Sequence, residues 1–294
     1  MKALYRLFTT YPLLVGWKRR GGASFVGPLD DYSGAQGAYS VARRLLSSYS
    51  GNLIRVRRSG DNTESDFGPN LNGDLDSAAV VSFVTAGGGT QHGYVSVVYD
   101  QSSFGYNLIQ STAASQLSIV TGGSLNTLNS VPCAESTVDG QFMFTNTFSA
   151  YTGSTLSAFL AGKFGGTAGF ERFFAATFDA EADNDSALRP GMLIRTGSVN
   201  QVCISRNALL ATLSRAYSTG FKLSSILNGT NAVLTDGAGS ASSASSGSLE
   251  INRYLLMGYT VSNGYSTAGA KFTEAFCYQS NQTSNETAIR AILT

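Results

Sequence analysis

The sequence predicts an all-β sandwich or jelly roll with a few short helices. The main observation is a long series of short runs rich in β-branched and aromatic residues, separated by turns of Gly, Asn, Ser and Thr. Short strands at such spacing are typical of sandwiches and jelly rolls. The second observation is size: 294 residues, 43% of them hydrophobic, suffice for one large domain with an ample core.

The first hundred residues contain two predicted helices and two predicted strands. Helices are expected over 38–49, which Gly51 would end, and over 76–85, and strands over 54–57 and 94–99. The first helix rests on apolar residues that recur at intervals of three and four, namely Ala38, Val41, Ala42, Leu45 and Tyr49. The strand over 54–57 is half-buried, because it alternates apolar residues with arginines.

Most later elements are predicted to be short strands. Their ranges are 142–144, 156–160, 173–178, 192–196, 202–205, 222–227, 232–234, 255–259 and 271–278. The low-complexity stretch 238–248 is predicted to be a mobile loop. A helix is predicted to end the chain, with Thr283 and Glu286 forming a reciprocal capping box.

Composition excludes several functions. A net charge of +1 gives no electrostatic footprint for nucleic acid, and no apolar run approaches the ~18 residues of a membrane helix. One histidine, His92, excludes zinc sites with two His ligands and argues against His-dependent catalytic triads. Cys133, Cys203 and Cys277 are far apart and form no CxxC motif. We therefore expect these cysteines to be small buried hydrophobic residues.

Residues 1–27 differ from the rest, because bulky apolar and basic residues there precede a Gly-Gly break. We predict an N-terminal arm or anchor, followed by one sandwich domain over 28–294. A plain first strand is the alternative, and Arg6 together with the lack of an A-x-A site argues against a signal peptide. The apolar contacts of the arm in an assembly would come from Leu13, Leu14, Val15 and Trp17.

Three blocks carry a family resemblance: RVRRSGDN at 55–62, LDSAAVVSFV at 75–84 and YDQS at 99–102. They resemble the α-L-arabinofuranosidase B catalytic-domain family, in the form found in tailed-phage virion proteins. The resemblance implies a concanavalin-A-like (laminin-G-like) jelly roll. The motif residues are interpreted as structural: Arg55, Arg57, Arg58, Asp61, Asn62, Tyr99, Asp100 and Gln101.

The resemblance also bears on catalysis. It implies an acid/base Asp in the Gly-rich turn before the last strand, yet no Asp or Glu lies between Glu250 and Glu274. Ser262 or Asn263 occupies the matching region, and neither is a workable general acid. The adjacent cysteines of the family's sugar pocket are also missing. We therefore expect that the protein is not an enzyme. Asp100 is open to two interpretations: it is either a catalytic acid or a polar turn residue that bonds the local backbone.

These observations lead to an expected function. We predict a non-enzymatic virion structural protein of a tailed phage, displayed on the head or tail as a fibre, decoration or receptor-binding subunit. Its expected partners are other virion proteins, further copies of itself and a host-surface glycan. No cofactor is expected, except for calcium at an acidic stretch that could equally be a solvated loop: Asp179, Glu181, Asp183 and Asp185. The alternatives are a lectin-like carbohydrate-binding module and an α-L-arabinofuranosidase-type glycosidase.

Overall fold

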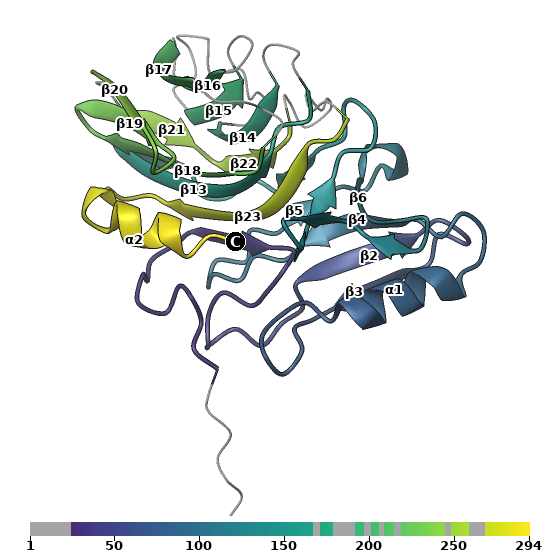
Figure 1. The fold of residues 1–294 in the computed structure, drawn as a ribbon. Helices are drawn as coiled ribbons and strands as arrows, with labels where there is room; N and C mark the ends of the chain where they lie inside the picture. The colour runs from purple at the N-terminus through teal and green to yellow at the C-terminus, as the bar shows by residue number, and fades with distance from the viewer. Residues whose placement is uncertain are drawn as a thin grey trace, which may run out of the picture.

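The protein folds as a two-layered antiparallel β-sandwich, as predicted (Figure 1). The computed structural model describes residues 25–166, 171–178, 192–196, 201–205, 209–214, 219–244, 248–258 and 268–294. The predicted arm lies almost wholly outside these residues.

The first layer is built around two long strands, β13 (Thr155–Lys163) and β23 (Lys271–Tyr278), which pair with each other. Across the layer the order is β1 (Gly37–Ser40), β23, β13, β18 (Phe221–Asn228), β19 (Asn231–Thr235) and β20 (Ser240–Ala244).

The second layer contains more strands than the first. Its order is β17 (Leu209–Ser214), β16 (Gln201–Ser205), β15 (Met192–Thr196), β14 (Arg172–Thr177), β22 (Arg253–Leu256), β11 (Met143–Thr145), β5 (Leu108–Ile109), β4 (Gly93–Val98), β2 (Ile54–Arg58) and β3 (Glu64–Phe67).

Short strands link and flank the layers. β6 (Leu117–Thr121) pairs with β4, and β10 (Ala134–Glu135) pairs with both β6 and β23, so the two layers are hydrogen-bonded to each other. The remaining short pairs are β7 (Ser124–Leu125) with β6, β8 (Thr127–Leu128) with β9 (Val131–Pro132), and β12 (Tyr151–Gly153) with β21 (Leu249–Ile251).

Strand β13 is buried on both faces and separates two hydrophobic clusters of the core. Leu160 points into the main cluster between the layers, whereas Phe159 points into a second cluster with Phe276 and Tyr278. Successive strand residues face opposite sides of a sheet, so both sides of β13 need cover. The second cluster is covered by α2 (Glu286–Ala291), which contributes Ile289.

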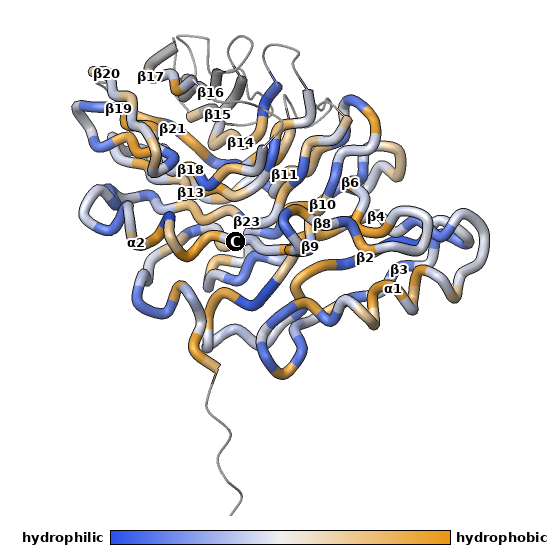
Figure 2. The backbone as a smooth tube through the Cα atoms, viewed as in Figure 1, coloured by the Kyte–Doolittle hydropathy of each residue, from blue (hydrophilic) through white to orange (hydrophobic). Residues whose placement is uncertain are grey.

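Helix α1 (Ser77–Ala86) covers the β2–β3 side of the molecule (Figure 1). The Asp76 side chain caps it by accepting the N–H of Ala79 at 3.1 Å, and Val80 and Val84 are its buried residues. Figure 2 shows hydrophobic residues recurring along α1 and along β2 beside it. The predicted helix over 76–85 and the predicted strands over 54–57, 94–99 and 271–278 are confirmed.

Three sequence predictions are wrong. Residues 38–49 are not helical: Gly37–Ser40 form β1, which pairs with β23 more than 230 residues away, and both Ala38 and Tyr39 are buried. The stretch 238–248 was predicted to be a mobile loop but contains β20, which pairs with the edge of β19. At the chain end Thr283 lies in a short 3-10 turn, η2 (Thr283–Asn285), and does not cap α2.

A second 3-10 turn, η1 (Ala113–Ser115), precedes β6. Among the described residues, no helix is long and apolar enough to span a membrane.

Candidate functional site

One end of the sandwich holds a buried carboxylate. Glu171 directly precedes β14, is only 1% exposed, and accepts the N–H of Gly165 with both oxygens at 3.1 Å. Beside it the rings of Phe164, Phe173 and Phe221 pack on one another, with centroids 4.8–5.4 Å apart. Burying a carboxylate is costly unless it is hydrogen-bonded, so this end of the sheet is built to hold one.

A second carboxylate approaches the same end from a distant part of the sequence. Asp139 is exposed, and its Oδ1 accepts the N–H of Ala268 at 2.9 Å. The next residue, Gly269, has φ +91°, and a Cβ there would lie 3.5 Å from the carbonyl oxygen of Gly165. Glu171 therefore bonds one member of the Gly165–Gly269 contact, and Asp139 bonds the residue that precedes the other.

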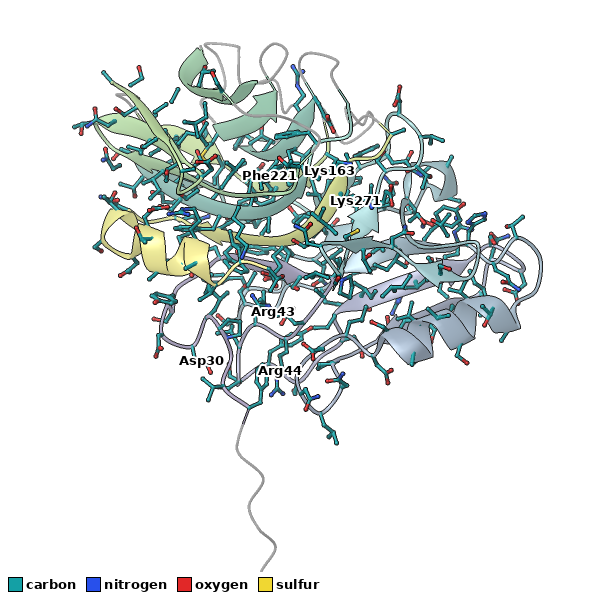
Figure 3. The ribbon with its side chains drawn as sticks, in the orientation of Figure 1. Asp30, Arg43, Arg44, Lys163, Phe221 and Lys271 are labelled. Carbon is teal, nitrogen blue, oxygen red and sulfur yellow. The ribbon has the colours of Figure 1, made fainter. Side chains whose placement is uncertain are left out.

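Two lysines lie at this end as well. Lys163 and Lys271 are direct partners across β13 and β23, and Figure 3 shows both near Phe221. Lys271 donates to the carbonyl of Thr127 at 2.9 Å and pairs with Glu135 at 3.4 Å. Within the described part of the chain, the ammonium group of Lys163 has neither a hydrogen bond nor an ion pair. Like charges opposite each other weaken a sheet, so the arrangement suits a site that binds polar ligands.

The arginines of the resemblance motif make contacts within the β2 region. Arg55 forms a bidentate pair with Asp66, at 2.8 and 2.9 Å, and Tyr99 donates to the same carboxylate. Hydrogen bonds to the Arg55 guanidinium and Tyr99 hydroxyl outweigh partial burial and lower the pKa of Asp66. These contacts join β2 to β3 and to the end of β4.

The other two arginines hold the turn that follows β2. Arg57 donates to Gln116 and to Asn62, both at 2.7 Å. Arg58 forms a bidentate pair with Asp61, at 2.7 and 2.8 Å, which lowers the pKa of that carboxyl.

Asp100 and Gln101 are buried and hydrogen-bonded to nearby parts of the chain. Asp100 accepts the N–H groups of Ala38, Ser102 and Tyr106 at 2.9 Å and the Ser102 hydroxyl at 2.7 Å. Gln101 bonds the backbone of residues 43 and 45 with both ends of its amide. All four donors to Asp100 come from the chain itself, so these oxygens are occupied.

Other predicted site residues do not gather into a site. The apolar arm residues Leu13, Leu14, Val15 and Trp17, the calcium candidates Asp179, Glu181, Asp183 and Asp185, and Ser262 and Asn263 all lie outside the described residues. Among those that are described, no group of three or more His, Cys, Asp or Glu could hold a metal ion.

The described cysteines are buried, whereas the single histidine lies nearer the surface. Cys133 and Cys277 are buried, as predicted, and burial raises the pKa of the Cys133 thiol to about 12. The side chain of Cys203 lies outside the described set. His92 is surface-facing and accepts the N–H of Gly122 at 3.3 Å.

Comparison with known proteins gives one family model and several solved structures. The catalytic-domain model of α-L-arabinofuranosidase B matches residues 30–162. An arabinofuranosidase complexed with arabinofuranosyl-α-1,2-xylobiose is 18% identical with a TM-score of 0.61, and covers 91% of this chain. A GH54 α-L-arabinofuranosidase soaked with a cyclic sulfate inhibitor is 20% identical with a TM-score of 0.63, and covers 90%. This is the fold of the arabinofuranosidases.

Two facts set the extent of that likeness. The chain spans 65% of the length of each of these structures. The search of curated proteins found no match.

The comparisons overturn the predicted function. The family model and the similar structures are glycosidases, and none of these findings indicates a virion protein, so the expectation of a non-enzymatic virion component is wrong. The error came from the turn at 259–270, which lacks a carboxylate of its own. Asp139 contacts the end of that turn from 129 residues away. The expectations about partners and virion location rested on the overturned interpretation.

Sequence reasoning missed both carboxylates of the candidate site. One signal was available: Glu171 and Arg172 interrupt the aromatic run FERFF. No sequence signal marked Asp139, because its contact with Ala268 exists only in the folded chain.

Proposed function

We propose that this chain is a glycoside hydrolase of the α-L-arabinofuranosidase type. The observation that carries the proposal is the pair Glu171 and Asp139 in a sandwich with the arabinofuranosidase fold: Glu171 bonds Gly165, and Asp139 bonds Ala268, whose neighbour Gly269 lies against Gly165. The resemblance of residues 30–162 to the family model supports the same class of reaction.

The chemistry of glycoside hydrolysis requires two carboxyl groups. One protonates the oxygen of the leaving group, while the other activates water or attacks the anomeric carbon. In this pair the exposed Asp139 is the group that solvent water can reach, so it takes the base or nucleophile role. As a base, Asp139 takes a proton from the attacking water while Glu171 gives one to the leaving alcohol, and proton exchange with solvent restores both groups. As a nucleophile, Asp139 bonds the anomeric carbon while Glu171 protonates the leaving alcohol, and a water deprotonated by Glu171 then breaks that bond. The products are arabinose and the free alcohol.

The aromatic and cationic neighbours suit substrate binding. Phe221 is partly exposed at the same end and can stack on the apolar face of a sugar ring. Lys163, beside it, can donate hydrogen bonds to sugar hydroxyls.

The test is hydrolysis of 4-nitrophenyl α-L-arabinofuranoside by the full chain. We expect turnover, and we expect Glu171→Gln and Asp139→Asn each to lower kcat at least 100-fold. Glutamine can still accept the N–H of Gly165, and thermal unfolding of the Glu171→Gln variant checks that it is folded.

Glu250→Gln is the matched control, because Glu250 is an exposed carboxylate on β21, in the separate β12–β21 pair. It should leave kcat unchanged. Absence of turnover in the wild type would overturn the proposal, and normal turnover in both carboxylate variants would overturn the assignment of the pair.

A further inference from the structure

A second concave feature lies away from the Glu171 end. Three loops, at 29–35, 46–49 and 101–104, enclose a cleft of about 480 Å³. Ligand pockets for small molecules span roughly 300–1,000 Å³, so this cleft is large enough for a sugar unit. Asp30, labelled in Figure 3, marks the neighbourhood of the cleft on the side of the molecule opposite Lys163 and Phe221.

The lining is apolar and uncharged. All twelve lining residues are neutral, and three of them are aromatic: Tyr32, Tyr49 and Phe104. Phe104 is 45% exposed, so part of its ring is open to a ligand. Burial and the charge of Asp100 raise the pKa of Tyr49 to about 12.

The acidic residues of the neighbouring chain, Asp30, Asp31 and Asp100, are not among the residues that line the cleft. Asp30 accepts the N–H groups of Gly27 and Ser47, at 2.6 and 2.8 Å. Asp100, below the cleft, is occupied by its four donors. A ligand of this cleft therefore meets no charged side chain in its lining.

Hydrogen-bonding groups are available along the rim and floor. Within the described residues the hydroxyls of Ser33, Ser48 and Ser103 have no hydrogen-bond partner. Gln101 is 2% exposed, and its Nε2 donates one hydrogen to the Arg43 carbonyl, which leaves the second without an acceptor among those residues. A buried donor without a partner is costly, and a ligand hydroxyl would satisfy it.

The aromatic walls are held in place before any ligand arrives. The Tyr49 hydroxyl donates to the carbonyl of Asn52, and its ring lies so close to Gly51 that a Cβ there would be 2.6 Å from the phenol oxygen. The ring of Phe104 contacts that of Tyr106, with centroids 5.6 Å apart. Preformed walls reduce the entropy lost on binding.

We propose that this cleft is a second saccharide-binding site, specific for neutral sugars and separate from the Glu171–Asp139 end. Sugars have apolar C–H faces that stack on aromatic rings and hydroxyls that match serine and amide groups. The choice of a pentose oligosaccharide as ligand rests on the proposed function. The preference for a neutral sugar rests on the cleft alone.

The test is calorimetric titration of the full chain with xylotriose, in a Glu171→Gln background so that no bond is cleaved. We expect saturable binding, and we expect Phe104→Ala to raise Kd at least tenfold. Leu71→Ala is the matched control, because Leu71 is a fully exposed apolar residue on another loop. It should leave Kd unchanged.

The outcomes separate the two proposals. Equal binding by wild type and Phe104→Ala, or no binding at all, would overturn this site. Phe104→Ala should also leave the hydrolysis of 4-nitrophenyl α-L-arabinofuranoside unchanged. Binding that depends on Phe104 in a protein without hydrolytic activity would uphold the cleft and refute the proposed enzyme.

Discussion

Four donors converge on the carboxylate of Asp100, and this convergence decides what the residue does. Oδ1 accepts from the backbone of residues 38 and 102, and Oδ2 accepts from the Ser102 hydroxyl and the Tyr106 backbone. These bonds tie the loop after β4 to β1. Glu171, by contrast, accepts the backbone N–H of Gly165 with both oxygens and directly precedes β14, at one end of the sheet.

Asp100→Asn tests the structural role. An asparagine amide nitrogen cannot accept a hydrogen bond, so at least one of the buried donors loses its acceptor. We expect the free energy of unfolding in urea to fall by about 2 kcal/mol. The control Asp236→Asn keeps the oxygen that caps a turn, through Ala238 and Gly239, and should cost less than about 0.5 kcal/mol. Equal stability of Asp100→Asn and wild type would refute the role.

At the scale of elements, α2 is attached to the sheet by polar contacts as well as by Ile289. Glu286 accepts from the Ser224 hydroxyl of β18 at 2.6 Å and from Arg290 at 2.7 Å. Burial by itself raises the pKa of Glu286, but these hydrogen bonds outweigh it and leave the pKa below its usual value. The carboxylate that sequence reasoning assigned to a capping box therefore anchors the helix to a strand.

If Glu286 anchors the helix, the stability lost in the Glu286→Gln variant should depend on pH. A lowered folded-state pKa contributes stability that is present above pH ~4.5 and is lost as the pH falls through the folded value. We expect the variant to be about 1 kcal/mol less stable from pH 7 to pH 5, with the gap closing below pH 4.5, as measured by urea unfolding at each pH.

Thr283→Ala serves as the control for the anchor, since among the described residues the Thr283 side chain bonds only Asn281. It should change stability by less than about 0.5 kcal/mol at every pH. A gap for Glu286→Gln that stays constant down to pH 3 would contradict the anchor.

For the whole molecule, one buried ion pair joins the beginning, the last strand and the end of the described chain. Glu274 on β23 is fully buried and forms a bidentate pair with Arg43, at 2.7 and 3.1 Å. It also accepts from Ser40 and from the N–H of Thr294. Arg43 in turn donates to the carbonyl of Ile292.

Arg43→Met leaves this carboxylate buried without its partner. We expect the free energy of unfolding to fall by about 3 kcal/mol, and we expect the double variant Arg43→Met, Glu274→Met to recover most of the loss. Arg55→Met is the control, because its pair with Asp66 is exposed, and it should cost at most about 1 kcal/mol. A double variant as unstable as the single one would contradict the ion-pair explanation.

The sequence by itself determined the class of fold and most of the strands. The alternation around Ile54 and Val56 and the apolar runs of β4 and β23 are local patterns, and strand propensity and burial follow from them. The helix α1 was predictable for the same reason. The blocks at 55–62, 75–84 and 99–102 pointed to the arabinofuranosidase resemblance.

Only the tertiary structure decided the rest. Residues 37–40 have helical spacing but form β1, because pairing with β23 and a bond to Asp100 outweigh local propensity. The carboxylates of the candidate site, Asp139 and Glu171, come together through Gly165, Ala268 and Gly269, and the cleft needs three separate loops. Contacts between residues more than a hundred positions apart leave no periodic signal in a sequence, so the site emerges only once the layers close.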